Sequence, residues 1–179
     1  MLRATFTLLT GGALAQLVPL LLGPVLARLF SPEAFGLFTA FATIAASVAV
    51  VACARYEYAL PMAHDDAEAA ALLSLALRIW VGVVALSVPL AWVLHAAGRL
   101  AVAWALPLSV AATGLLQLLM MWSNRAEAYG ALAASRFVQY AGAALLQVAL
   151  GWWLWRGSAA GADAAWALVL GPVIAVALA

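Results

Sequence analysis

The sequence predicts an all-α protein, a polytopic membrane helix bundle of about six transmembrane helices. Of its 179 residues 69% are hydrophobic and 8% are charged, whereas about 25% charged residues is usual in a soluble domain. Its mean hydropathy is +1.12. Long uncharged runs, such as residues 5–27 and 34–54, are sufficient to cross a bilayer about 30 Å thick. Short polar turns separate the runs, which suits antiparallel neighbouring helices in one membrane domain spanning residues 1–179.

The first helix, expected over about residues 5–27, contains two prolines and a polar residue near its middle. Pro19 and Pro24 each remove a backbone donor and clash with the preceding turn, which predicts a kink or partial unwinding. Gln16 has two interpretations: it makes a hydrogen bond to a neighbouring helix, or the helix lines a path through the bundle.

The second helix is expected to run from about Glu33 to about Met62. Ser31 and Pro32 are typical of a helix start, with serine at the cap and proline at the first position. Arg55 and Glu57 near the far end are two residues apart, about 200° around a helix, so they are not expected to pair with each other there. Each therefore needs its own partner, water or a ligand.

Four further helices are expected at about residues 70–95, 100–123, 126–155 and from 164 onward. Asp65, three residues before Glu68, predicts a cap for the third helix, and a metal site of His64, Asp65 and Asp66 is the alternative. Pro89 is expected to kink that helix.

The boundaries of the last helices follow from polar segments. Asn124 and Glu127 predict a cap for the fifth helix, and residues 156–163 form the turn before the sixth. The sixth helix stops at Ala179 without a closing charge, so we expect the chain to be truncated within this helix.

The arginines predict the orientation in the membrane. With a cytoplasmic N-terminus, the inside set has five members and the outside set three, which the positive-inside rule favours. The inside set is Arg3, Arg55, Arg78, Arg125 and Arg136, and the outside set is Arg28, Arg99 and Arg156.

Five strings in order resemble the Wzx-type lipid-linked oligosaccharide flippases, which handle O-antigen and exopolysaccharide repeat units and belong to the multidrug/oligosaccharidyl-lipid/polysaccharide (MOP) exporter superfamily. The most specific is the first-loop string from Leu26 to Phe38, which contains Arg28, Ser31, Pro32 and Glu33. The others are Arg55-Tyr-Glu57-Tyr-Ala, Trp122-Ser-Asn124-Arg125, Ala-Ser135-Arg136-Phe-Val-Gln139 and Leu-Val-Leu170-Gly171-Pro-Val-Ile. The chain departs from the first string at Phe30, where tyrosine is common, and at Ala34, where a second acidic residue often sits.

The resemblance implies the N-terminal lobe of a transporter of about twelve to fourteen spans, in which two bundles rock about a central cavity. The substrate it implies is an undecaprenyl-pyrophosphate-linked oligosaccharide, flipped across the bacterial inner membrane by alternating access. Its other expected partners are membrane lipids and the glycosyltransferases and polymerase of the same pathway. No cofactor and no nucleic-acid partner is expected, and the net charge is +1.

Arginines are the expected substrate ligands, because a pyrophosphate in a low-dielectric cavity must be neutralised and arginine binds it in bidentate geometry. Arg28 and Arg55 come from adjacent helices, at opposite ends if the second helix is straight, and we expect them to meet the phosphates in turn. Glu57, Gln16 and Arg136 complete the predicted substrate-binding set. The alternatives are that Arg28 anchors a helix end and pairs with Glu33, that Arg55 and Glu57 lie in interfacial water, and that Arg136 only sets topology.

Three other functions compete with the flippase. A cation-driven multidrug exporter of the same superfamily would need a buried carboxylate, and Glu33 and Glu57 are the only acids close to membrane depth. A membrane enzyme of polyprenyl-linked glycan assembly, such as a polymerase or ligase, would need a large catalytic loop, whereas the predicted outside turns are short and no catalytic motif is present. A structural subunit without substrate is the third. We therefore expect a transporter and not an enzyme.

Overall fold

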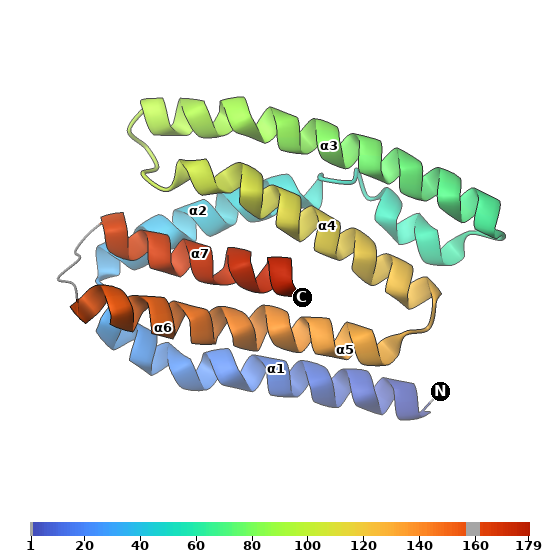
Figure 1. The fold of residues 1–179 in the computed structure, drawn as a ribbon, viewed down its shortest axis with the longest axis horizontal. Helices are drawn as coiled ribbons and strands as arrows, with labels where there is room; N and C mark the ends of the chain where they lie inside the picture. Colours follow the sequence, from blue (N-terminus) through green and yellow to red (C-terminus); the bar gives the residue numbers. More distant parts are fainter. Residues whose placement is uncertain (1, 157–161) are drawn as a thin grey trace.

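The computed structural model describes the backbone of residues 2–156 and 162–179, and side chains over 12–13, 15–154 and 164–179. All regular structure in this part of the chain is helical, which confirms the all-α prediction. Figure 1 shows the long helices lying side by side, with the chain direction alternating from one helix to the next. The elements are α1 (Leu2–Leu29), α2 (Pro32–Val50), the 3-10 helix η1 (Tyr56–Met62), α3 (Asp66–Ala96), the 3-10 helix η2 (Ala103–Ala105), α4 (Leu106–Arg125), α5 (Tyr129–Phe137), the π-helix η3 (Val138–Gly142), α6 (Ala143–Arg156) and α7 (Ala162–Leu178).

Four helical segments among the described residues are long and apolar enough to cross a membrane. They are Pro32–Val50, Asp66–Ala96, Ala103–Arg125 and Tyr129–Leu154. Two apolar segments, Ala15–Leu29 and Ala164–Leu178, are shorter. These lengths support a helical membrane protein, and the total of six spans stays a prediction.

Two predicted helix starts are confirmed by their hydrogen bonds. The hydroxyl of Ser31 accepts from the amide of Ala34 at 3.3 Å, at the start of α2. The carboxylate of Asp65 accepts from the amide of Glu68 at 2.6 Å, and Glu68 accepts from the amide of His64 at 2.8 Å. Both caps satisfy amide groups that the first helical turn leaves without partners. Within the described residues no three His, Cys, Asp or Glu side chains form a metal-binding group.

The prediction for helix α1 was a kink or partial unwinding. The helix stays α-helical through both of its prolines, so partial unwinding is wrong, and the kink stays a prediction. Each proline leaves only one carbonyl without its helical donor. Helices α5 and α6 pack along α1, and such packing stabilises the helix around the missing bonds. Pro89 likewise lies inside α3, which is helical from Asp66 to Ala96.

The second helix is shorter than predicted, because α2 ends at Val50 and not near Met62. A turn over residues 51–55 follows, with Ala54 (φ 48°) and Arg55 (φ 65°) in the left-handed region. The 3-10 helix η1 then packs against α3 and α4 through an apolar cluster, namely Cys53, Leu60, Ala76 and Leu118. Long-range burial of this segment therefore outweighs its local helix propensity.

The predicted cap of the fifth helix is also wrong. Helix α4 continues to Arg125, Glu127 is left-handed with a φ of 53°, and α5 begins only at Tyr129. The start of α4 differs as well, because Pro107 lies in its first turn, where proline needs no donor. Most of the predicted turn over 156–163 lies outside the described residues.

The bundle has its main core between α2, α4 and α7, and residues at the end of α1 and in the turn after α3 contribute to it. Helix α1 lies beside α5 and α6, and α3 lies on the far side of α4 (Figure 1). Glycines allow close approach where helices cross. A Cβ on Gly151 would lie 2.5 Å from the ring of Phe30, and one on Gly171 would lie 2.7 Å from Gln147 Cγ.

Candidate functional site

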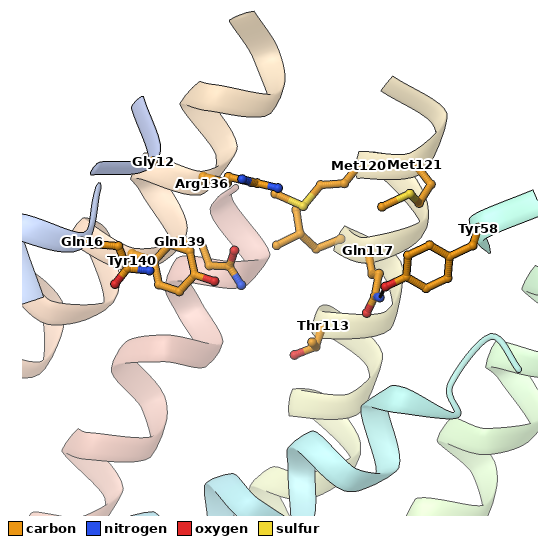
Figure 2. Close-up of a pocket in the computed structure, with 11 residues that line it drawn as sticks. Gly12, Gln16, Tyr58, Thr113, Gln117, Met120, Met121, Arg136, Gln139 and Tyr140 are labelled. Carbon is orange, nitrogen blue, oxygen red and sulfur yellow. Dashed lines mark hydrogen bonds between the residues drawn. The ribbon is translucent and has the colours of Figure 1, made fainter. Parts of the chain in front are cut away.

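A polar cavity of about 400 Å³ opens between α1, η1, α4 and the joined helices α5 and η3. Figure 2 shows two walls of side chains facing each other across it. Its lining residues are Gly12, Gln16, Tyr58, Thr113, Leu116, Gln117, Met120, Met121, Arg136, Gln139 and Tyr140. Polar groups gathered in an otherwise apolar bundle mark this cavity as the candidate site.

The first wall is built by α1 and by the irregular helix that follows α5. Gln16 comes from α1, Arg136 from the end of α5, and Gln139 and Tyr140 from η3. A π-helix contains one more residue in its hydrogen-bonded turn than an α-helix, and such turns are frequent at functional sites. The wider turn presents Gln139 and Tyr140 to the same cavity as Arg136 (Figure 2).

The second wall is built by α4 and η1. Thr113 and Gln117 are one helical turn apart on α4, so they lie on one face. The Gln117 amide donates to the Tyr58 hydroxyl at 3.1 Å, which joins η1 to α4 at the cavity (Figure 2). The guanidinium carbon of Arg55 lies 5.3 Å from the centre of the Tyr58 ring, a cation–π contact.

The lining has the chemistry of a site for an anionic, hydroxyl-rich ligand. Its described side chains carry one guanidinium, three carboxamides and three hydroxyls, and none of them is a carboxylate. A guanidinium binds phosphate or carboxylate oxygens in bidentate geometry. Carboxamides and hydroxyls both donate and accept hydrogen bonds, which suits sugar hydroxyls.

The structure brings together only two of the five predicted site residues. Gln16 and Arg136 line the cavity. Arg28 is exposed near the opposite end of α1, and Arg55 is exposed outside the cavity lining. Glu57 is buried on η1 and is also outside the cavity lining.

The alternative pairing of Arg28 with Glu33 is not formed. The ion pairs among the described residues join His64 to Glu68 at 3.3 Å and Arg125 to Asp66 at 2.9 Å. The role of Arg125 was missed at the sequence level. Its guanidinium also donates to the carbonyls of Ala63 at 2.8 Å and Leu60 at 3.4 Å, so it fastens the end of η1 to α4.

Gln117 and Gln139 line the cavity but were not among the predicted site residues. The sequence did contain a signal for them, because both are polar residues inside apolar helices. The signal is not selective, because Gln147 in α6 is equally polar and has a structural role. Its amide is buried and donates to the carbonyl of Leu168 at 2.8 Å, joining α6 to α7. Tyr58 was visible only as part of the string over residues 55–59, and Tyr140 gave no sequence signal, since tyrosines are common near membrane interfaces.

No family model, curated protein or solved structure matches this chain. The resemblance to the flippases therefore rests on the five strings, and the structure places three of them near the cavity. Residues 55–59 contribute Tyr58, residues 134–139 contribute Arg136 and Gln139, and residues 122–125 end the helix that forms the second wall. The string with Gly171 lies where α6 and α7 make close contact.

Proposed function

We propose that this chain is one lobe of a membrane transporter that flips undecaprenyl-pyrophosphate-linked oligosaccharide, an O-antigen or exopolysaccharide repeat unit. The observation that carries the proposal is the cavity in which Arg136 lies among three carboxamides within an apolar helical bundle. We place the chain in a bacterial inner membrane with its N-terminus in the cytoplasm.

Each kind of lining group has a part in this function. Arg136 neutralises a phosphate that has left water, which would otherwise be costly in a low-dielectric bundle. Gln16, Gln117 and Gln139 exchange hydrogen bonds with the sugar hydroxyls. Apolar groups, such as Leu116 and Met120, cover the less polar faces of the sugar rings and the start of the lipid.

Alternating access requires a second lobe across the cavity, against which this bundle rocks. In this scheme Arg28 and Arg55 meet the pyrophosphate in turn at opposite ends of the path, and Arg136 binds it between them. The cation–π contact of Arg55 with Tyr58 links one of these end positions to the cavity wall.

Binding to the full chain in lipid nanodiscs tests the site. The ligands are an undecaprenyl-pyrophosphate-linked oligosaccharide and the same oligosaccharide without lipid and pyrophosphate. Removing a charge-assisted hydrogen-bonding partner costs about 1.5–3 kcal/mol, so Arg136→Ala should weaken binding of the first ligand by about tenfold to a hundredfold. It should leave any affinity for the second unchanged.

Arg78→Ala is the matched control, because Arg78 is exposed on α3 and does not line the cavity. Equal affinities of Arg136→Ala and the unmodified protein for the lipid-linked ligand would disprove the proposed site. In a liposome assay of flipping, full activity of both Arg28→Ala and Arg55→Ala would disprove their sequential role.

A further inference from the structure

Glu57 is a buried carboxyl group with an unsatisfied oxygen. Its side chain is 2% exposed, and among the described residues its Oε2 has no hydrogen-bond partner. It lies on η1, which packs against α3 and α4 through the apolar cluster of Cys53, Leu60, Ala76 and Leu118. An ionised carboxylate is very costly in such surroundings unless it is paired, whereas the neutral acid is much less so.

The charged side chains around Glu57 are engaged elsewhere or exposed. On its own segment Arg55 lies over the Tyr58 ring, and the thiol of Cys53 is the neighbour with which Glu57 interacts electrostatically. On α4, Arg125 binds Asp66 and two backbone carbonyls. The titratable groups of α3 are at its ends or on its exposed face, namely Asp66, Glu68, Arg78 and His95.

The backbone before Glu57 is strained. Ala54 and Arg55 are consecutive non-glycine residues in the left-handed region, with φ angles of 48° and 65°. Such conformations persist only where surrounding packing imposes them. Here the packing is that of η1 on α3 and α4, so weakening it would release strain at residues 54–55.

We propose that Glu57 is a proton-binding site that controls how the segment 51–62 packs against α3 and α4. With the proton bound, the carboxyl is neutral and the segment remains in place. When the proton leaves to water, the anion can be hydrated only if the segment moves outward. Tyr58 belongs to this segment and lines the cavity, so proton loss would also remove the Tyr58–Gln117 hydrogen bond from the cavity wall. The proton site does not depend on which molecule the cavity binds.

Cys53, the only cysteine of the chain, is a built-in reporter of this movement. It is 2% exposed, and burial raises the pKa of its thiol above the usual value for cysteine. Alkylation of the full chain in nanodiscs by N-ethylmaleimide should therefore be slow at neutral pH and should require the outward movement. The Cys53→Ala variant gives the background.

The pH dependence of alkylation distinguishes the proton site from a permanently charged Glu57. Thiolate formation alone raises the rate by about tenfold per pH unit. If Glu57 must lose a proton as well as the thiol, the alkylation rate of the unmodified protein should rise by up to about 100-fold per pH unit. Glu57→Gln keeps the shape and the neutral state, so it should show the tenfold slope and slower labelling at high pH.

The opposite result would overturn the proposal. If Glu57 is ionised while buried, Glu57→Gln removes a negative charge beside Cys53, lowers the pKa of the thiol and speeds its labelling. Glu127→Gln, which alters an exposed carboxylate at the same end of the bundle, should keep the steep slope. Hydrogen exchange of the amides of 51–62, corrected for the intrinsic rate at each pH, gives a second readout. Exchange protection that does not fall with rising pH would also overturn the proposal.

Discussion

Two glycines of this bundle differ in how much space surrounds them. A Cβ added to Gly114 of α4 would lie 2.7 Å from Trp80 Cδ1 and 3.1 Å from the Cβ of Ala52. The indole of Trp80 cannot move freely, because its nitrogen donates to the carbonyl of Ala111 at 3.1 Å. A Cβ on Gly82, which is exposed on α3, would have nothing within 4 Å.

Gly114→Ala should therefore destabilise the protein by about 1–3 kcal/mol, as overpacking of a tight contact usually does. Gly82→Ala is the matched control, and it should be neutral or stabilising by up to about 1 kcal/mol, because alanine is the better helix former. Unfolding by SDS in mixed micelles measures both. A similar loss of stability in both variants would contradict the contact seen at Gly114.

Substitutions of two glutamines in apolar helices should have different effects, one on stability and the other on ligand binding. Gln147 is buried and donates to the carbonyl of Leu168. Gln147→Leu should therefore lower stability by about 0.6 kcal/mol, the average for hydrogen bonds between membrane helices, and by about 1.7 kcal/mol at most. Gln16 is exposed in the cavity, so Gln16→Leu should leave stability unchanged and weaken binding of the lipid-linked oligosaccharide. SDS unfolding and nanodisc binding would show these opposite patterns. Loss of stability in Gln16→Leu would instead assign Gln16 a packing role.

At the scale of elements, one side chain holds η1 against α4. Arg125 donates to the carbonyls of Ala63 and Leu60 near the end of η1, and it pairs with the exposed carboxylate of Asp66. The carbonyl contacts involve partly buried groups, whereas an exposed ion pair contributes about 0–1 kcal/mol.

Arg125→Ala should therefore destabilise the packing of η1 by about 1–3 kcal/mol, since it leaves carbonyls without a donor. Asp66→Ala should cost less than about 1 kcal/mol. Hydrogen exchange of residues 56–63 measures the effect locally. Equal deprotection in the two variants would mean that the ion pair, and not the carbonyl contacts, holds the segment.

Elements whose boundaries depend on local chemistry were predicted well from the sequence. Ser31 and Asp65 satisfy amides within three residues of themselves, so the starts of α2 and α3 were visible in the sequence. The break after Val50 was not visible, because residues 51–55 contain no glycine or proline and the turn depends on burial of Cys53 and Leu60 against other helices. The π-helix η3 was not visible either, because its sequence resembles that of an ordinary helix; in the structure it packs against α1 and α7.

The candidate site was predicted only in part for the same reason. Gln16 and Arg136 attract notice because polar groups are costly in apolar helices. Tyr58 reaches the cavity only because η1 packs against α4, and Tyr140 only because of the wide turn of η3. Charge and the first-loop string suggested Arg28, although it lies at the other end of α1 from the cavity wall formed by Gln16.

At the scale of the whole molecule, the helix directions sort the arginines between the two ends of the bundle. The turns after α1 and α3 lie at one end in Figure 1, with Arg28 and Arg99. The N-terminus and the turn after α4, with Arg125, lie at the other. From the sequence, five arginines are assigned to the N-terminal end and three to the other end, so the positive-inside rule predicts that the N-terminal end lies in the cytoplasm.

Cysteines placed at the two ends test this orientation. In a Cys53→Ala background, His64→Cys marks the predicted cytoplasmic end and Ala97→Cys marks the predicted outer end, and both positions are exposed. A membrane-impermeant maleimide added to intact cells should label Ala97→Cys at once and His64→Cys only after lysis. Labelling in the reverse order would place the N-terminus outside, and the cavity wall formed by η1 would then face the outer leaflet. Arg55 would in that case meet the glycolipid last and Arg28 first, so the order of contacts in the proposed flipping path depends on this result.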